Sequence, residues 1–536
     1  GGNLVQESYW DIQSVSNPLI SPDGKYVIFT KKFIDKKNDK RITEHWIMES
    51  NGSNKRFFVK GSNPKWSPSS KKIAYIKEDE NGKSQIYVKN LANESVTKIT
   101  NFKDDIKDFS WSPDGEHFSF VAFQEYADNW IIEIPGKIEG NKYNWTEDPK
   151  VITTMHWRDD GVGELESGEN HLHLVNSSGG AAIKVSEWGL DYIADLQWLN
   201  NSQLLFSGND SLDDLQTPWK QSGVFLLNIK NKKLEKISNK DGVFMTPKAS
   251  TDGKKIAFIG HPSKDYSSVA HDVYLRDITT GRNKKLTENL SSSPKNLFWL
   301  SENQLAFDLD ERGSSKVMQL NTDNLKLSER ISGFAEQFFL SSTNKEDLYG
   351  TYITSDRPGE VAVVKKTKLE SLTEFNELIL GQYDLGKTHE INYQAPDGTS
   401  IQGWYITPPN FDKDKTYPLI LLIHGGPHAM YRPAFSYLRH QFASDGYVVL
   451  FTNPRGSTGY GSKFANVIDN DYPGAGDLSD LLAGVDHITE KGFIDKSRMY
   501  VQGCSGGGVL AAWVIGHDDR FAAAASLCPV TNWISM

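Results

Sequence analysis

The sequence predicts two domains of different architecture, a seven-bladed β-propeller followed by an open parallel α/β sheet. Three observations support this prediction: a strand unit that repeats through the first two thirds, an alternation of strands and helices from about residue 380, and one strand–turn–helix motif near the end. At 536 residues, the chain is also too long for a single hydrophobic core. We place the propeller in residues 1–375 and the α/β domain in residues 376–536.

The repeated unit is an apolar or aromatic residue, a turn of the type S-P-D-G, and a strand of alternating apolar residues. Proline presets the first central φ angle of this turn, aspartate hydrogen-bonds the backbone, and glycine takes the left-handed position. Two short strands are therefore joined tightly. Complete or degenerate copies begin at Ser21, Trp66, Trp111, Trp198, Ala249, Trp299 and Phe339.

The spacing of these turns favours a propeller over a flat sandwich, which would not explain an ordered period. Four intervals measure 45 to 51 residues, which is about the length of a four-stranded blade. The interval from Ser112 to Leu199 is 87 residues and could hold an eighth blade. It contains one strand of the outer type, near Leu172, so we expect a third blade with an insertion at about 124–168.

This insertion is rich in aromatic and acidic residues, and insertions on rigid scaffolds often carry function. Glu164 and Glu166 could bind a substrate ammonium group, or they could be solvated surface carboxylates.

Composition narrows the function further. A net charge of −10 argues against nucleic-acid binding, and no apolar run is long enough to span a membrane. Two cysteines, Cys504 and Cys528, are too few for a disulfide framework or a zinc site, and no metal or organic cofactor is implied. The chain begins Gly1-Gly2-Asn3, so we expect that a signal peptide or an expression tag was removed. The compartment is left open, with a periplasmic or secreted location slightly favoured over the cytoplasm.

The last third reads as uninterrupted apolar strands separated by helices, which is typical of a parallel sheet covered on both faces. We expect a hairpin at Glu390–Ile406, strands at Pro418–Ile423, Tyr447–Thr452, Met499–Val501 and Ala522–Leu527, and helices near Ala434–Ala443, Leu478–Glu490 and Val509–Ile515.

A nucleophile elbow is predicted at Gly503-Cys504-Ser505-Gly506-Gly507, between a strand and a helix. The turn is so tight that the residues two before and two after the serine must lack bulk. This geometry would lift the Ser505 hydroxyl above the sheet edge, at the positive end of the following helix. The alternative is a glycine-rich turn with an incidental serine.

A second loop, His424-Gly425-Gly426-Pro427, directly follows another strand, where this fold class places an oxyanion-hole donor. We expect the two donors to be the backbone amides of Gly426 and Gly506. A third loop, Asn453–Gly461, also leaves a strand end. Its Arg455 could anchor a substrate carboxylate or form a structural ion pair with acids after Asp469.

Three motifs follow the seven-unit propeller in a fixed order: H-G-G-P, N-P-R-G-S-T-G-Y-G and G-C-S-G-G-G. Together they resemble the prolyl oligopeptidase family of serine peptidases. The resemblance is to its acylaminoacyl-peptidase and bacterial dipeptidyl-peptidase-like branch. It implies a propeller that caps an α/β-hydrolase domain, an active site in the cavity between them, and short peptides as substrates. It assigns Ser505 as the nucleophile and the backbones of Gly426 and Gly506 as the oxyanion hole.

Two positions depart from the pattern of the family. Many relatives carry an aromatic residue where this chain has Gly506, which removes a pocket wall. In some relatives a tyrosine hydroxyl serves the oxyanion at the position of His424, so the backbone is the expected donor here.

The general base is the part that the sequence does not supply. In this fold the acid and the histidine follow the serine, yet the one later histidine, His517, lies twelve residues along the same helix, about 18 Å away. We therefore expect a truncated α/β-hydrolase domain, with the acid and the base on a segment that is missing or separate.

The sequence thus predicts a serine peptidase that cleaves short peptides near their N-terminus. We expect no nucleic-acid or membrane partners, and a homo-oligomer is possible. An esterase on the same fold and a catalytically silent propeller binding protein are the alternatives.

Overall fold

The computed structural model describes the whole chain except residues 128–151, 153–156, 210–221, 334 and 535–536. The chain forms two compact units. One contains residues 1–61 and 248–536, and the other contains residues 62–247.

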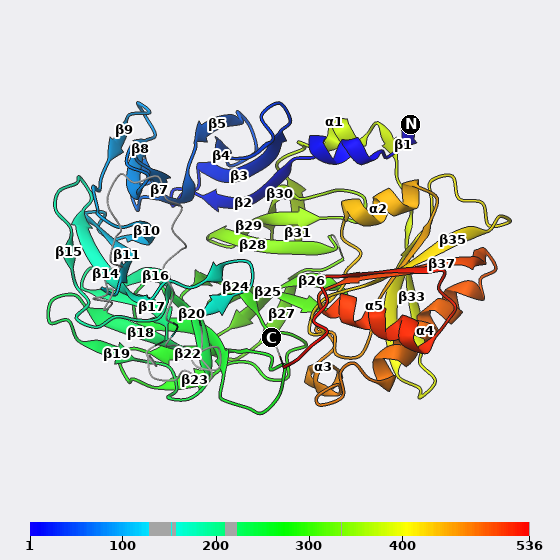
Figure 1. Cartoon of the computed structure of the whole chain (residues 1–536). Coiled ribbons are helices and arrows are strands. Elements are labelled where there is room, and N and C mark those ends of the chain that lie inside the picture. The colour runs from blue at the N-terminus through cyan, green and yellow to red at the C-terminus, as the bar shows by residue number, and fades with distance from the viewer. Residues whose placement is uncertain (128–151, 153–156, 210–221, 334, 535–536) are drawn as a thin grey trace, which may run out of the picture. The chain divides into compact units, whose positions relative to one another are not determined.

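The described residues form seven four-stranded antiparallel sheets, which confirms the predicted seven blades (Figure 1). The first is β2 (Ser14–Ile20), β3 (Tyr26–Asp35), β4 (Lys40–Glu49) and β5 (Arg56–Val59). The second is β6 (Ser62–Trp66), β7 (Lys72–Glu78), β8 (Ser84–Asn90) and β9 (Val96–Lys98). The third is β10 (Ile106–Trp111), β11 (His117–Glu125), β14 (Gly168–Asn176) and β15 (Ile183–Lys184).

The fourth sheet is β16 (Ile193–Asn200), β17 (Gln203–Gly208), β18 (Gly223–Asn228) and β19 (Leu234–Lys236). The fifth is β20 (Val243–Ala249), β21 (Lys255–His261), β22 (Asp272–Asp277) and β23 (Asn283–Lys285). The sixth is β24 (Lys295–Ser301), β25 (Gln304–Glu311), β26 (Ser314–Asn321) and β27 (Leu327–Ile331). The seventh is β28 (Gln337–Asn344), β29 (Asp347–Ile353), β30 (Glu360–Lys365) and β31 (Lys368–Ser371).

Between β11 and β14 the chain leaves the third sheet, and β12 (Arg158–Asp159) pairs there with β13 (Gly163–Glu164). Glu164 and Glu166 are exposed, and the choice between their two proposed roles stays a prediction. Most of the predicted insertion, including Trp130 and Trp145, lies outside the described residues.

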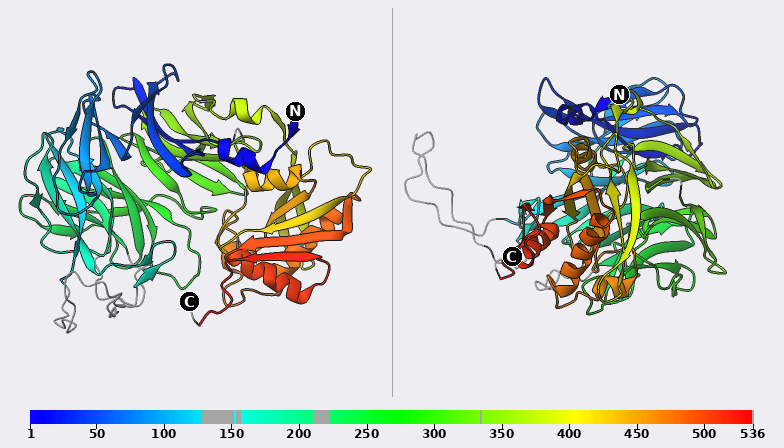
Figure 2. Two further views of the ribbon diagram at one scale, coloured as in Figure 1. Left: turned by 45° about the horizontal axis from the view of Figure 1, so that its top comes forward. Right: turned by 90° about the vertical axis from the view of Figure 1, so that its right-hand side faces the viewer.

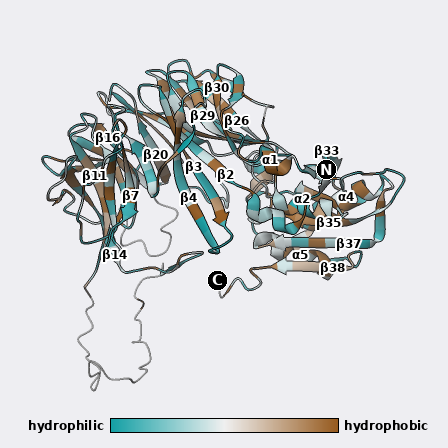
Figure 3. Ribbon diagram, turned by 90° about the horizontal axis from the view of Figure 1, so that it is seen from above, coloured by the Kyte–Doolittle hydropathy of each residue, from teal (hydrophilic) through white to brown (hydrophobic). Residues whose placement is uncertain are grey.

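Apolar side chains on the strands pack neighbouring blades together. Figure 3 shows brown, hydrophobic segments along the strands of the propeller. The first and seventh sheets share one core, in which Val15 and Phe29 pack with Tyr349, Val361 and Val363. The first and last blades are therefore neighbours, as a closed propeller requires.

The serine of the S-P-D-G turn has a role that the sequence analysis did not assign. Ser21, Ser67, Ser112 and Ser250 are buried, and each hydroxyl accepts a hydrogen bond of 3.0 Å from the backbone amide five residues later. In the turn at Ser112, the same hydroxyl donates to the Asp114 carboxylate at 2.6 Å. The serine thus joins the two ends of the turn.

After the seventh blade come α1 (Glu377–Leu380) and β32 (Tyr383–Asp384), which pairs in parallel with β1 (Gly2–Asn3); the short helix η1 (Gln6–Asp11) follows β1 in the chain. The domain boundary at residues 375 and 376 stays a prediction.

The C-terminal domain is a sheet of order β33-β34-β36-β35-β37-β38. The strands β36, β35, β37 and β38 are parallel, as predicted, and the predicted hairpin β33–β34 is found to add antiparallel strands at one edge. The strands are β33 (Thr388–Gln394), β34 (Ser400–Ile406), β35 (Tyr417–Ile423), β36 (Val448–Asn453), β37 (Ile494–Cys504) and β38 (Ala523–Leu527). The helices are α2 (Tyr437–Ser444), α3 (Ser462–Asn466), α4 (Ala475–Thr489) and α5 (Gly506–His517).

Alternate residues of β35 serve the two faces of this sheet. Leu419, Leu421 and Ile423 belong to the core that contains residues of α4 and α5, whereas Ile420 and Leu422 pack in the core on the side of α2. Figure 2 shows α4 (orange) and α5 (red) on the same side of the sheet. Buried on both faces, the central strands hold the loops at their carboxyl ends in fixed positions.

Replacing Ser112 with alanine tests the role of the turn serine. The backbone amide of His117 and the carboxylate of Asp114 would each lose a partner, so we expect the free energy of unfolding to fall by about 1–2 kcal/mol. Urea unfolding followed by tryptophan fluorescence measures this, with the exposed Ser95→Ala as the control that should leave it unchanged. Equal effects of the two variants would contradict the prediction.

Candidate active site

The two loops predicted to form the site are brought together by the parallel pairing of β35 with β37. In this register Ile423 pairs with Gly503, so His424-Gly425-Gly426 and Cys504-Ser505-Gly506 leave the sheet side by side. A Cβ atom placed on Gly425 would lie 3.8 Å from the Cβ of Ser505. Residues about eighty positions apart in the sequence thus meet at one point of the sheet edge.

Ser505 has the backbone of a nucleophile elbow. Its φ and ψ angles are 56° and −121°, a region that a residue with a side chain rarely adopts. Its amide donates to the carbonyl of Leu527 at 2.9 Å, and its carbonyl accepts from the amide of Val509 at 3.0 Å. The side chain is exposed at the first turn of α5. The structure therefore presents the hydroxyl of Ser505 to solvent, as predicted.

The glycines around Ser505 are required by close backbone contacts. A Cβ atom on Gly503 would lie 2.2 Å from the carbonyl oxygen of Gly507, and one on Gly507 would lie 2.2 Å from the carbonyl oxygen of Ile423. A Cβ atom on Gly506 would lie 2.5 Å from the carbonyl oxygen of Gly426. Gly506 therefore lets the two loops touch, which an aromatic side chain at this position would prevent in the present backbone.

The amides of Gly426 and Gly506 are free within the part of the chain that the structure describes, since neither has a hydrogen-bond partner there. Gly506 is the first residue of α5, where helix geometry leaves the amide unpaired. Gly426 has a φ angle of 113°, which favours glycine. Two unpaired amides beside an exposed serine are what an oxyanion hole needs, although the assignment of both residues stays a prediction.

The ring of His424 is occupied elsewhere. It is buried, with Nε2 2.8 Å from the Ser457 hydroxyl and Nδ1 2.6 Å from the carbonyl oxygen of Gly425. Burial lowers the pKa of this imidazole. His424 thus supports the loop, consistent with the expectation that the backbone supplies the donor.

Among the described residues, no histidine forms a hydrogen bond with Ser505. Nδ1 of His517 lies 2.8 Å from the carbonyl oxygen of Trp513, and its ring packs against the Trp513 ring at the far end of α5. The Ser267 hydroxyl lies 2.8 Å from Nε2 of His428 and also donates to Asp469, but the carboxylate binds the serine and not the imidazole. That cluster therefore lacks the order of a catalytic triad.

The two cysteines are bonded to each other, which the sequence analysis did not predict. Cys504, next to the nucleophile, and Cys528, directly after β38, have Cα atoms 5.6 Å apart. Residues 24 positions apart carry no sequence signal for this pairing. Only the parallel register of β37 and β38, with Cys504 opposite Leu527, brings them together.

Arg455 forms the structural ion pair that was one of its two predicted roles. Its guanidinium donates to Asp480 through Nε at 2.9 Å and to Asp397 through one terminal nitrogen at 2.7 Å. The other terminal nitrogen bonds both carboxylates. These hydrogen bonds hold the pKa of Asp397 well below its usual range. Four of the five guanidinium N–H groups are engaged in this way, so Arg455 serves the structural ion pair.

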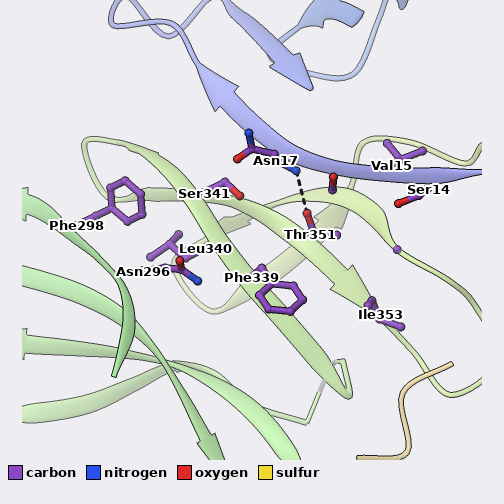
Figure 4. Close-up of a pocket in the computed structure, with 12 residues that line it drawn as sticks. Ser14, Val15, Asn17, Asn296, Phe298, Phe339, Leu340, Ser341, Thr351 and Ile353 are labelled. Carbon is purple, nitrogen blue, oxygen red and sulfur yellow. Dashed lines mark hydrogen bonds between the residues drawn. The ribbon is translucent and has the colours of Figure 1, made fainter. Parts of the chain in front are cut away.

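A pocket of about 540 Å³ lies in the propeller among β2, β24, β28 and β29 (Figure 4). The pocket is lined by Phe298, Phe339 and Ile353 together with polar groups. The backbone amide of Asn17 donates to the Thr351 hydroxyl at 3.2 Å. None of its twelve lining residues carries a charge. Its lining therefore combines apolar side chains with neutral polar groups.

Within the described ranges no cluster of histidine, cysteine or acidic side chains could hold a metal ion. The described helices include none long and apolar enough to cross a membrane.

Fold and site together define a serine hydrolase, in which an α/β-hydrolase domain follows a seven-bladed propeller. Residues 433–536 match the prolyl oligopeptidase family. This match confirms the resemblance that the sequence motifs predicted, and the chain is a serine-type peptidase.

Similar proteins extend over the whole chain. The uncharacterized peptidase YuxL of Bacillus subtilis is 27% identical over 98% of this chain and 82% of its own length. Dipeptidyl-peptidase 5 of Porphyromonas gingivalis is 24% identical over 98% of this chain and 78% of its own length. A solved acylaminoacyl peptidase, in complex with Z-Gly-Gly-Phe-chloromethyl ketone, has a TM-score of 0.82 at 21% identity and covers 99% of this chain and 80% of its own. This structural likeness extends the fold assignment to both domains.

The Arg455 ion pair gives a prediction that depends on pH. Arg455→Ala leaves the fully buried Asp480 carboxylate without its partner, so we expect the free energy of unfolding to fall by about 3–5 kcal/mol at pH 8. Burial raises the pKa of Asp480, so in this variant the folded state favours the protonated acid, and the loss should shrink as the pH falls to 5.

Urea unfolding at both pH values measures this effect. The control is Arg498→Ala, which removes an exposed pair with Asp495 and should cause little change. A loss that is the same at pH 5 and pH 8 would show that packing, and not the buried charge, is responsible.

Proposed function

We propose that the protein hydrolyses short peptides near their N-terminus through an acyl-enzyme at Ser505. The observation that supports this most strongly is the register of β35 and β37, which sets an exposed serine with a strained backbone beside two unpaired amides. In this mechanism the Ser505 oxygen attacks the peptide carbonyl, and a tetrahedral oxyanion forms beside the amides of Gly426 and Gly506. Collapse of this intermediate releases the amine product, and water then hydrolyses the ester.

The attack requires a base that accepts the proton of the serine hydroxyl. The described residues place no imidazole at Ser505, so the expectation that the acid and the base lie on a further segment stays a prediction. The proposal concerns the groups that this chain itself provides, namely the nucleophile and the oxyanion donors.

The names of the similar proteins support peptides as substrates. Relatives are called dipeptidyl-peptidase 5, and a structural neighbour is an acylaminoacyl peptidase with a peptide chloromethyl ketone. Release of a dipeptide and release of one acylated residue are therefore the two activities to compare. Hydrolysis of a simple ester would use the same serine and amides. Comparing the turnover of dipeptidyl anilides, acylaminoacyl anilides and esters therefore shows whether peptidase or esterase activity is the stronger.

Labelling with a fluorophosphonate tests the nucleophile directly. This reagent phosphonylates an activated serine with loss of fluoride, and negative charge develops on its phosphoryl oxygen in the transition state, where an oxyanion hole stabilises it. We expect the full-length native protein to be labelled on the peptide that contains Ser505, and Ser505→Ala to lose all labelling and peptidase activity. Label on another serine, or activity that survives in the variant, would exclude Ser505 as the nucleophile.

Two glycines of α5 form a matched pair for testing the oxyanion hole. Gly506→Ala places a methyl group 2.5 Å from the Gly426 carbonyl oxygen and should push the loops apart, lowering the labelling rate on the order of a hundredfold. Gly516→Ala, in the same helix, enters open space and should leave the rate unchanged while stabilising the helix by about 1 kcal/mol. Equal rates in the two variants would contradict the role of Gly506.

A further inference from the structure

Helix α5 begins with three consecutive glycines, Gly506, Gly507 and Gly508. Close backbone contacts require glycine at these positions, because a Cβ atom added to them would lie 2.5, 2.2 and 2.5 Å, respectively, from neighbouring carbonyl oxygens. Glycine is also the residue with the greatest backbone freedom, and each costs a helix about 1 kcal/mol relative to alanine. The turn that must hold the Gly506 amide still is therefore intrinsically the weakest part of the helix.

Two side-chain hydroxyls from outside the helix bind the carbonyls of this turn. The Tyr472 hydroxyl donates to the carbonyl oxygen of Gly506 at 2.8 Å. The Ser526 hydroxyl donates to the carbonyl oxygen of Gly508 at 2.7 Å from β38. These bonds supply from neighbouring elements the restraint that the glycines lack.

The loop that carries Tyr472 is held at Gly474, which precedes α4. The Trp513 indole of α5 donates to the carbonyl oxygen of Gly474 at 3.2 Å, and Asp477 accepts a hydrogen bond from the Gly474 amide at 2.8 Å. The half-buried ring of Tyr472 packs against the core that contains α4 and α5. Burial raises the pKa of the Tyr472 hydroxyl, so it remains a donor at all ordinary pH values.

We propose that Tyr472 is a positioning residue for the oxyanion hole, acting through the backbone of Gly506. The carbonyl that it binds and the amide expected to bind the oxyanion flank the same Cα atom, so fixing the first limits rotation of the second. Donors that are already oriented need no reorganisation when the charge develops, which is the source of oxyanion-hole catalysis. This inference rests on the proposed function of Ser505 and extends it to a residue 34 positions away from Gly506 in sequence.

Tyr472→Phe is the test, because it removes the hydroxyl and keeps the ring. The matched control is Tyr393→Phe, which removes another tyrosine hydroxyl that donates to a backbone carbonyl at 2.8 Å, that of Asp480, elsewhere in the same domain. In the full-length protein we expect Tyr472→Phe to lower the rate of fluorophosphonate labelling and kcat by about three- to tenfold, with KM unchanged. Tyr393→Phe should leave these rates unchanged.

Amide hydrogen exchange of Val509, whose amide donates to Ser505, gives a readout that does not depend on activity. It should become faster in Tyr472→Phe alone. Faster exchange with an unchanged labelling rate would reduce Tyr472 to a helix anchor and overturn the proposal. A change confined to KM, or an equal loss of rate in both variants, would also overturn it. If the wild-type protein resists labelling, the proposed function fails; if it is labelled and Tyr472→Phe matches it, this inference alone fails.

Discussion

The parallel pairing of β35 with β37 is the constraint on which the site depends. Because Ile423 lies opposite Gly503, the glycine loop and the serine turn leave the sheet at the same level. Side chains alternate between the faces of a strand, so a slip of one residue would turn the buried residues of β35 toward the wrong core. The hydrophobic cores on both faces therefore hold the proposed nucleophile and amide donors in register, although the core residues are not part of the proposed site.

Glycines allow the two loops to approach each other closely, but they also make the serine turn more flexible. Contact between the loops requires glycine at positions 503, 506 and 507, because any Cβ atom there would collide with a backbone carbonyl. The same glycines weaken the turn, and bonds from other elements compensate. Leu527 binds the Ser505 amide, Cys528 is bonded to Cys504, and Tyr472 and Ser526 bind the carbonyls that follow. The elbow is thus kept in a strained conformation by its surroundings.

The tertiary structure decides between the two roles that the sequence allowed for Arg455. Its position after a strand end suits substrate binding as well as an ion pair. The hairpin β33–β34 brings Asp397 to one side of the guanidinium, and α4 brings the buried Asp480 to the other. Paired with both carboxylates, Arg455 stabilises the loop that follows β36.

The sequence by itself determined the seven blades, the parallel sheet, the elbow at Ser505 and the glycine loop, because each is encoded by neighbouring residues whose turn chemistry is local. It also suggested the family, because three such motifs occur in a fixed order. Only the tertiary structure decided the partner of Arg455, the bond between Cys504 and Cys528, and the contact of Tyr472 with Gly506. These pairs join residues that are tens of positions apart, and their distances are set by strand register and helix packing, which no local pattern encodes.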